Sequence, residues 1–555
     1  MKIKFLALAM IAMLFTACKP DPQGGEGSDP NNGEVENSYI AISLASSDSE
    51  NRGEDNVKDY FEGEDNERAV KSAHVFFFTD GEPFIGVSSP RNYQTIPLTG
   101  NSTTLTNSNI SDIHESVLVI ENYKGELPNQ MVAVLNWSPS EDTYSLNSLI
   151  EALVGHINNI DGVEYFVMSN SVYKNEAGIV YATPLDITNF YDDATNAKDN
   201  PVKVYVERVA SKVIVDTPSD NTTHRFKLKT SKTDDSPIVI GGENVYAKII
   251  GWDLYNDYET SNLIKNIEDY TLGINWNDPN NFRSYWATCT GATMTDAVDY
   301  DGITDYHPYL YCGENTRGNI DANLRTKIIL KAQLQNEAGN KIIEVAKWFG
   351  NDYVGEEQLL AAVKSTISNT YYSSTDGLTY TSIGVEDLMT VAGGDGGNIK
   401  AYQVYFQLND TVADKGVDKT WYKLVNGEFK LIEDVDVDGD GDIDGDDGDI
   451  DGDGDVDLND ELKLYIAPAL LYADGMTYYH TDIEHLKSAT TTTYGVVRNH
   501  IYDININSIS GLGTPVADET ITITKPEIPE EEGSTYVAAE INILSWRLIT
   551  NDVNL

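Results

Sequence analysis

The stretch VVRNHIYDININSISGLG, residues 496–513, decides the fold of this chain. Over residues 502–507 (YDININ), apolar and polar side chains alternate at every position. A period of two is typical of a β-strand with one face buried and the other in water. The closing GLG, residues 511–513, is expected to end the domain to which this strand belongs.

Strand signals of this kind recur along the chain, whereas helical ones are few. Four more stretches are rich in β-branched and aromatic residues and are separated by turn-forming clusters. They are residues 39–44 (YIAISL), 74–78 (HVFFF), 130–135 (QMVAVL) and 203–215 (KVYVERVASKVIV). Helices are predicted over 146–157, from apolar residues at helical spacing, and over 356–365 (EEQLLAAVKS). The pattern predicts an all-β chain of β-sandwich domains with a few short helices.

The first residues, MKIKFLALAMIAMLFTAC, have the features of an export signal. Two lysines precede an apolar run over residues 5–15, which is too short to span a membrane. This predicts a secretory signal peptide over residues 1–17. Cys18 ends a lipobox-like FTAC and is expected to become the lipidated first residue, with the polar residues 19–34 as its tether. The alternative is an ordinary signal peptide followed by a chance cysteine.

Composition limits the size of the fold and its partners. The chain of 555 residues suffices for roughly three or four average domains, or for two large β domains. Hydrophobic residues make up 40% of it, which supports buried cores. The formal net charge of -51 disfavours binding to nucleic acid. Cys289 and Cys312 could pair in an oxidising compartment or remain free thiols.

The chain ends in an apolar segment that follows a linker. Residues 521–535 (ITITKPEIPEEEGST) are acidic and contain prolines, so they are expected to be extended. Residues 536–548 (YVAAEINILSWRL) then form a β-prone segment, which needs a sheet edge because an isolated strand is not stable in water.

Both faces of this segment carry apolar side chains. Ile541 and Ile543 fall on one face, and Leu544, Trp546 and Leu548 fall on the other. A strand that is apolar on both faces favours burial in a groove. The alternative is that the segment folds back onto its own domain as a last strand, because the linker is long enough to allow it.

Together these features resemble the fimbrillins that build type V pili in Bacteroidales, and most closely the major shaft subunit of the minor (Mfa-type) fimbrium. The resemblance is spread along the chain and contains no catalytic signature. It rests on FTAC at 15–18, NSYIAISL at 37–44, QMVAVLNW at 130–137, VERVASKV at 206–213, VVRNHIYDININSISGLG at 496–513 and INILSWRL at 541–548.

The resemblance implies two transthyretin-like Greek-key β-sandwich domains, made as an outer-membrane lipoprotein precursor and ending in an extracellular fimbrium. An arginine-specific extracellular protease would release the lipidated leader and first strand, and the C-terminal donor strand of another copy would fill the groove. Anchor and tip pilus subunits, and host or bacterial surface ligands, would be further partners. The domains implied are a signal peptide at 1–17, a leader at 18–52, an N-terminal sandwich at 53–217, a C-terminal sandwich at 218–513, a linker at 514–535 and the donor strand at 536–555.

The cleavage site is expected in the polar segment SDSENRGED, residues 47–55. Arg52 lies there, directly after the predicted first strand, so that a cut would free this strand. Arg68, in NERAVKSAHV, is the second choice because it lies closer to the next strand. The alternative for Arg52 is an ordinary loop arginine.

An acidic insert at 433–461, EDVDVDGDGDIDGDDGDIDGDGDVDLNDE, departs from the fimbrillin pattern. It contains two copies of the calcium-loop pattern, with oxygen ligands at positions 1, 3, 5, 7 and 12 and glycine at position 6. The first copy has Asp436, Asp438, Asp440, Asp442 and Asp447; the second has Asp449, Asp451, Asp453, Asp455 and Asp460.

Position 12 is aspartate rather than glutamate, and the sequence predicts no clear flanking helices. The insert is therefore expected to hold Ca²⁺ as a structural clamp, as in dockerin-type or thrombospondin-type loops. The alternative is a solvated acidic loop that never orders.

The sequence favours a structural role over catalysis. It contains no G-x-S-x-G, H-E-x-x-H, Walker or Rossmann motif, so an enzyme is not predicted. The expected function is a shaft subunit of a cell-surface pilus, supporting adhesion and biofilm formation. The alternatives are a tip or adhesin subunit of the same pilus type, or a monomeric surface-anchored binding lipoprotein.

Overall fold

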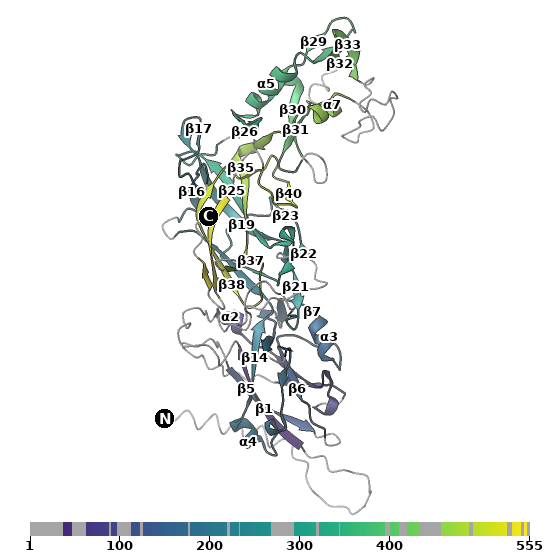
Figure 1. Cartoon of the computed structure of the whole chain (residues 1–555), viewed down its shortest axis with the longest axis vertical. Helices are drawn as coiled ribbons and strands as arrows, with labels where there is room; N and C mark the ends of the chain where they lie inside the picture. Colours follow the sequence, from purple (N-terminus) through teal and green to yellow (C-terminus); the bar gives the residue numbers. More distant parts are fainter. Residues whose placement is uncertain are drawn as a thin grey trace, which may run out of the picture.

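The computed structural model is an elongated molecule made mostly of strands (Figure 1). An all-β fold with few short helices is confirmed. Among the residues that the structure describes, no helix has the length and apolarity needed to cross a membrane. Described are residues 37–46, 63–87, 90–96, 113–121, 126–175, 178–218, 222–231, 233–267, 294–317, 321–342, 345–393, 400–409, 419–432, 457–487, 492–529, 536–544 and 549–551.

The N-terminal domain is organised around one sheet of nine strands. Seven of these strands lie side by side in the order β3-β2-β6-β10-β14-β1-β5, while β13 also pairs with β6 and β4 with β2. The strands are β1 (Asn37–Ser46), β2 (Ala73–Thr79), β3 (Glu82–Pro83), β4 (Tyr93–Ile96), β5 (Ile113–Glu121), β6 (Gln130–Leu135), β10 (Met168–Asn170), β13 (Thr183–Pro184) and β14 (Val202–Arg208).

Both faces of this sheet are buried, which explains the continuous apolar run in β2. Val75 and Phe77 belong to the core on one face, and Phe76 and Phe78 belong to the core on the other. Successive residues of a strand point to opposite faces, so a strand between two cores must be apolar at every position. Two short helices accompany the sheet, α3 (Leu146–Glu151) and α4 (Ala194–Asp199).

The C-terminal domain is a sandwich of two five-stranded sheets around the largest core. Val213 and Tyr502 from one sheet share this core with Trp252 and Ile328 from the other. One sheet has β24 (Leu310–Cys312), β15 (Ser211–Asp216), β38 (Ile501–Ser510), β41 (Tyr536–Leu544) and β42 (Ile549–Asn551); the other has β16 (Arg225–Lys227), β19 (Tyr246–Tyr255), β25 (Lys327–Gln335), β35 (Met476–Asp482) and β39 (Thr514–Pro515).

Both domains also contain short two-stranded sheets. One of them, between β21 and β7, joins the C-terminal part of the chain to the N-terminal part. The pairs are β8 (Ile157–Ile160) with β9 (Val163–Phe166), β11 (Tyr173–Asn175) with β12 (Gly178–Val180), β17 (Val239–Ile240) with β18 (Glu243–Asn244), β20 (Asp257–Tyr258) with β22 (Met294–Thr295), β21 (Thr260–Asn262) with β7 (Leu153–Gly155), β23 (Val298–Asp299) with β40 (Thr522–Ile523), and β36 (Glu484–Lys487) with β37 (Thr492–Tyr494).

The stretch 203–215, which the sequence presents as one strand, is split between the two domains. β14 ends at Arg208 in the N-terminal sheet, and β15 begins at Ser211 in the C-terminal sandwich. The chain therefore passes between the domains at Val209 and Ala210, before the predicted boundary at 217. Strand propensity cannot detect this passage because both halves are equally β-prone.

The helix predicted over 146–157 is too long. The helix α3 ends at Glu151, and Leu153 and Ile157 lie in the short strands β7 and β8. Tertiary pairing of β7 with β21 overrides the helical spacing in this region. The second predicted helix is confirmed as α5 (Glu356–Ile367).

A further unit is inserted between β25 and β35, which are neighbours in the same sheet. We call residues 345–472 the inserted module, because many of them share a core of their own around Leu359, Phe406 and Leu462. It lies at the end of the molecule away from β1 and β6 (Figure 1). Its elements are β26 (Val345–Trp348), β27 (Asn351–Val354), α5, β28 (Tyr371–Ser374), β29 (Thr381–Ser382), β30 (Leu388–Ala392), β31 (Val404–Leu408), β32 (Thr420–Val425), β33 (Glu428–Leu431), α7 (Leu458–Tyr465) and β34 (Leu470–Tyr472).

Candidate functional site

The first strand, β1, lies inside the N-terminal sheet and not at its edge. It pairs in parallel with β14, where Ile42 faces Val202 and Ser46 faces Val206 in the register. On its other side it pairs antiparallel with β5 over nine residue pairs, from Asn37 to Ala45. Among the described strands β5 pairs with β1 alone, so loss of β1 would leave β14 with an unpaired edge and β5 without a partner strand.

The sheet around β1 also contributes to an apolar core. Ile40 is fully buried and belongs to the same core cluster as Leu118 of β5 and Val204 and Val206 of β14. In the sequence, Ile42 and Leu44 follow Ile40 at a period of two. Any strand that replaced β1 would need apolar side chains at alternate positions to restore this core.

The C-terminal strand β41 pairs with the chain's own β38. The pairing is antiparallel, and its register places Ile541 opposite Ile504 and Ile543 opposite Tyr502. The structure thus shows the arrangement in which the terminal segment folds back onto its own domain. Leu544 ends β41, whereas Trp546 and Leu548 lie outside the described residues.

Asp503 of β38 lies at this pairing, opposite Asn542 of β41 in the register. Burial raises the pKa of the Asp503 carboxyl to about 6, and repulsion from Asp216 adds to the effect. The charged form of this carboxyl is therefore less stable here than it is in water.

The two strands β1 and β41 match in length. β1 has 10 residues and β41 has 9, and each makes nine antiparallel residue pairs, with β5 and β38 respectively. Apolar residues also alternate in β41, where Val537, Ala539, Ile541 and Ile543 occupy every second position. By length and pattern, β41 has what a replacement for β1 requires.

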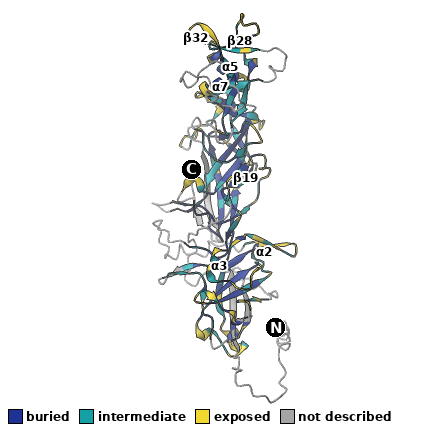
Figure 2. Cartoon of the chain, turned by 90° about the vertical axis from the view of Figure 1, so that its right-hand side faces the viewer, coloured by how far each residue is buried: buried dark blue, intermediate teal, exposed yellow. Residues whose placement is uncertain are grey.

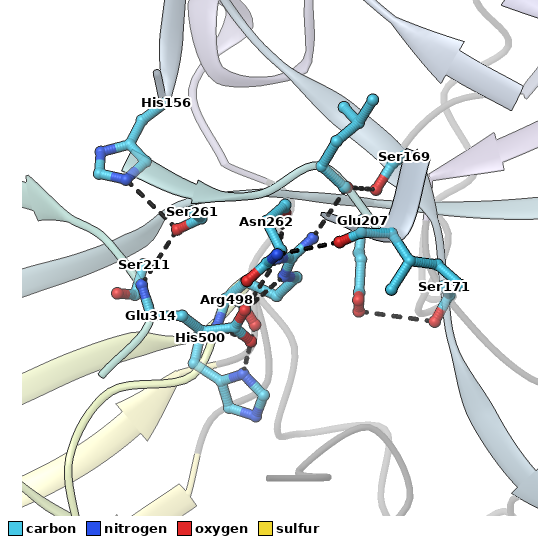
Figure 3. A network of polar contacts seen from close by, with 12 residues as sticks. His156, Ser169, Ser171, Glu207, Ser211, Ser261, Asn262, Glu314, Arg498 and His500 are labelled. Carbon is cyan, nitrogen blue, oxygen red and sulfur yellow. Dashed lines mark hydrogen bonds and ion pairs between the residues drawn. The ribbon is translucent and has the colours of Figure 1, made fainter. Parts of the chain in front are cut away.

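A buried polar network lies where the two domains meet (Figure 3). Arg498 and Glu314 are 0% and 1% exposed and form an ion pair of 2.8 Å. The guanidinium also donates to the carbonyl oxygens of Asn262 (2.5 Å) and Leu263 (3.2 Å). Ser169 of β10 donates to the same Leu263 oxygen at 2.5 Å, so this carbonyl joins the N-terminal sheet to Arg498.

The network extends to His156, beside Ser261 (Figure 3). Burial lowers the pKa of His156 to about 4, and repulsion from Arg498 adds to this, so the imidazole is neutral at physiological pH. None of these residues was identified from the sequence as part of a site. The only signal was a charged residue following two apolar ones at 496–498.

Most of the predicted calcium ligands, Asp436 to Asp455, fall in a stretch that the structure does not describe. Asp460 is described and buried, and its carboxylate accepts the backbone N–H of Asp457 at 2.8 Å. Asp457 is the N-cap of α7, so a helix begins within the last residues of the insert, where the sequence predicted none. Within the described ranges, no three His, Cys, Asp or Glu side chains are grouped to hold a metal.

The remaining predicted sites are placed as follows. Cys18, Arg52 and Cys289 lie outside the described part of the chain. Cys312 is fully buried and free, and its sulfur lies 3.1 Å from the hydroxyl of Ser211. Arg68 is the last residue of the short helix α2 (Asp65–Arg68).

Comparison with known proteins places the C-terminal part of the chain in a family. Residues 470–552 match the family model described as "Major fimbrial subunit protein type IV, Fimbrillin, C-terminal". This stretch contains β38, whose alternating residues first indicated the fold, and β41, which pairs with it. Among curated proteins, none matches the chain.

Similar solved structures include a candidate cell adhesion protein from Parabacteroides distasonis, with 12% identity, a TM-score of 0.34, and 91% of this chain and 97% of that chain covered. A fimbrilin (FimA) from Porphyromonas gingivalis W83 has 10% identity and a TM-score of 0.30, with coverage of 92% and 98%. The tip fimbrial protein Mfa3 from Porphyromonas gingivalis has 11% identity and a TM-score of 0.28, with coverage of 92% and 100%.

The match over residues 470–552, together with the β-rich fold, is similar to what a fimbrial subunit would show. The fimbrillin match over residues 470–552 agrees with the prediction of a structural protein rather than an enzyme. The chain's C-terminal region, residues 470–552, is that of a fimbrillin.

Proposed function

We propose that this protein is a shaft subunit of a cell-surface pilus and polymerises by donor-strand addition. It is exported as a lipoprotein held by Cys18 in the outer membrane, and an arginine-specific extracellular protease cuts after Arg52. The cut frees β1 together with its lipid anchor. The C-terminal strand of another copy then takes its place, and the growing pilus supports adhesion and biofilm formation.

The observation that carries this proposal is the interior position of β1. Because β1 lies between β14 and β5, its removal opens a groove with two unpaired edges beside the apolar core around Ile40. A free strand edge recruits another strand through backbone hydrogen bonds. A strand in the place of β1 would make five residue pairs with β14 and nine with β5, whereas β41 makes nine with β38 and three with β42.

Polymerisation also requires β41 to leave β38. The strand then exchanges pairing in its own subunit for pairing in the groove of the next subunit. A head-to-tail contact of this kind does not close on itself, so it produces a filament rather than a ring. In the folded-back arrangement, β38 pairs with the backbone of β41 before assembly.

Cleavage of the purified precursor tests this function. Treatment with an arginine-specific protease should produce SDS-resistant ladders, and Arg52→Ala should prevent them because β1 stays in place. Arg91→Ala is the matched control, since the side chain of Arg91 is half exposed and its ion pair with Asp142 lies at the surface. Ladders from Arg52→Ala would rule out this cleavage site. Absence of ladders from fully cleaved protein would contradict the shaft role.

We further propose that the acidic insert binds structural Ca²⁺. The support is the start of α7: Asp457 caps this helix and Asp460 is its third residue. These residues are positions 9 and 12 of the second loop pattern, and a helix that begins at position 10 suits an oxygen-ligand calcium loop. Dense carboxylates repel one another, and a hard divalent cation relieves that repulsion.

Calcium is expected to protect the insert from proteolysis. Digestion by a protease specific for acidic residues should slow at least about tenfold within 433–461 when Ca²⁺ replaces a chelator, because bound metal orders the loops. A variant with Asp449→Asn and Asp451→Asn should lose this protection, whereas Asp192→Asn, in the N-terminal domain, should keep it. Equal digestion of the insert in calcium and in chelator would contradict the proposal.

A second candidate function is that of an adhesive tip subunit, and the inserted module favours it. The far end of this module, around β28 and β32, contains many exposed and half-buried residues (Figure 2), and several of them are aromatic. The rings of Tyr380 and Phe429 stack at 3.8 Å, Tyr372 packs against Phe429, and Leu378 is 84% exposed. Exposed aromatic groups on a separate module suit ligand binding. A tip subunit would form no ladder by itself, which separates the two candidates.

A further inference from the structure

Residues 63–72, directly before β2, are tightly fixed at the domain junction. They include the short helix α2 (Asp65–Arg68), in which Glu67 is 0% exposed. A carboxylate in a short surface helix is ordinarily solvated. The burial of Glu67 therefore needs partners that compensate for the loss of water.

Those partners come from the C-terminal sandwich. The Lys212 ammonium of β15 donates to a Glu67 carboxylate oxygen at 2.6 Å, and the Tyr311 hydroxyl of β24 donates to the same oxygen at 2.5 Å. The Lys212 side chain is itself only 4% exposed. Burial by itself would raise the pKa of Glu67, but the hydrogen bonds from Lys212 and Tyr311 outweigh it and lower the pKa, so the carboxylate is charged. We call Glu67, Lys212 and Tyr311 the Glu67 anchor.

The backbone on both sides of Arg68 is also held. The carbonyl oxygen of Glu67 accepts from the Arg208 guanidinium at 2.6 Å. The carbonyl oxygen of Ala69 accepts from the Asn136 side-chain amide at 2.9 Å, and the N–H of Lys71 donates to Asn136 at 2.7 Å. Asn136 is fully buried and adopts a positive φ of 57°, a conformation that asparagine tolerates better than most residues.

These contacts bear directly on proteolysis. A protease binds several residues on each side of the cut in an extended form, so a folded segment must open locally first. Around Arg68, opening would break the ion pair of Glu67 with Lys212 and the backbone bonds to Arg208 and Asn136. Arg68 thus lies in a segment that opens rarely, although its own side chain is only half-buried.

We infer that the Glu67 anchor closes the Arg68 site to arginine-specific proteases and sets the N-terminal limit of the mature subunit. The inference rests on the proposed cleavage of the leader, and it explains why that cleavage occurs upstream of Arg68. Cutting upstream of the anchor frees β1 but leaves α2 bound to Lys212 and Tyr311. The remaining chain then stays tied at α2 to the C-terminal sandwich while the groove between β14 and β5 opens.

The test compares cleavage after Arg68 in the full-length precursor and its variants. New N-termini beginning at Ala69 are quantified by mass spectrometry during digestion with an arginine-specific protease. A synthetic peptide of residues 60–76 gives the rate for the unfolded segment. We expect cleavage after Arg68 at least about 100-fold slower in the precursor than in the peptide. In Glu67→Gln and in Lys212→Met this rate should rise at least about tenfold over the unaltered precursor.

Glu151→Gln is the matched control, because Glu151 is an exposed carboxylate at the end of α3 and should leave the rate unchanged. Cleavage of the unaltered precursor after Arg68 at the peptide rate would overturn the inference. So would unchanged rates in both anchor variants.

Two further measurements cover the case in which an anchor variant fails to fold. Tyr311→Phe removes one hydrogen bond and keeps the ring, so it should give a smaller rise in cleavage after Arg68. In the unaltered precursor, the amides of Glu67 and Lys71 should exchange with deuterium at least about 100-fold more slowly than in the peptide, since they donate to Glu64 and Asn136. Exchange at the peptide rate would contradict the proposed role of the Glu67 anchor. Pilus assembly is a separate readout. Missing ladders would contradict the proposed function, but they would not affect the measured rate of cleavage after Arg68.

Discussion

Deletion of residues 536–555 is expected to abolish the SDS-resistant ladders that the cleaved precursor forms. The deleted variant keeps its groove between β14 and β5, but it has no strand to donate. Donor-strand contacts resist SDS because a strand buried in a groove combines a full backbone ladder with apolar side chains in pockets. Gel electrophoresis without heating, after cleavage with the arginine-specific protease, measures the result.

Two experiments sharpen this prediction. Added to the unaltered subunit, the deletion variant should shorten the ladders, because it accepts a strand and donates none. Within β41, Ile541→Asn together with Ile543→Asn should also prevent ladders, whereas Glu540→Gln, at an alternating polar position, should not. Ladders of normal length from the deletion variant would contradict donor-strand addition.

Replacement of Arg498 by methionine is expected to destabilise the protein by about 3–5 kcal/mol, the usual cost of removing one partner from a buried ion pair. Glu314 would remain as a buried carboxylate without its partner, and the carbonyl oxygens of Asn262 and Leu263 would each lose a donor. Denaturant unfolding followed by tryptophan fluorescence measures the loss, with each transition fitted separately because a protein of several domains need not unfold in one step.

Lys71→Met is the control for this experiment. Lys71 pairs with Asp161 at 3.6 Å, but the two side chains are 48% and 80% exposed. Surface pairs of this kind contribute about 0–1 kcal/mol. A loss below about 1 kcal/mol for Arg498→Met would show that the buried pair does not stabilise the junction.

A pilus subunit of this kind must exchange one strand and yet keep its domains joined. Donor-strand addition needs one replaceable strand, β1, whereas a filament under load needs domains that do not separate. The Arg498 network and the Glu67 anchor both lie at the domain junction, and neither includes a residue of β1 or β41. The strand can therefore be exchanged without breaking the contacts that join the domains.

Several local features were predictable from the sequence because they depend on short-range periodicity. The period of two over 502–507 predicted β38, and the β-branched and aromatic stretches predicted β1, β2 and β6. The helix α5 was likewise predicted, with Glu356 and Glu357 in its first turn. These patterns work because the face that a residue presents depends on its place in a strand or helix.

The inserted module was not predicted, because nothing local distinguishes an insertion from the strands that precede it. It is recognised only from the pairing of β25 with β35, which lie far apart in the sequence. The same limit explains the error over 146–157, where apolar spacing fitted a helix but pairing of Val154 with Ser261 made a strand. Local propensity yields to tertiary pairing when the two compete.

The sequence alone therefore determined the class of fold, the first described strand, β1, and the apolar segment near the C-terminus. These follow from patterns within about ten residues, where side-chain periodicity acts directly. Only the tertiary structure showed that β1 lies between β14 and β5, that β41 rests on β38, and that Arg498 and Glu67 are buried with partners. Glu314 lies 184 residues from Arg498, and Lys212 lies 145 residues from Glu67. Such pairs exist only because folding closes the long loops between them, and no local pattern records which loops close.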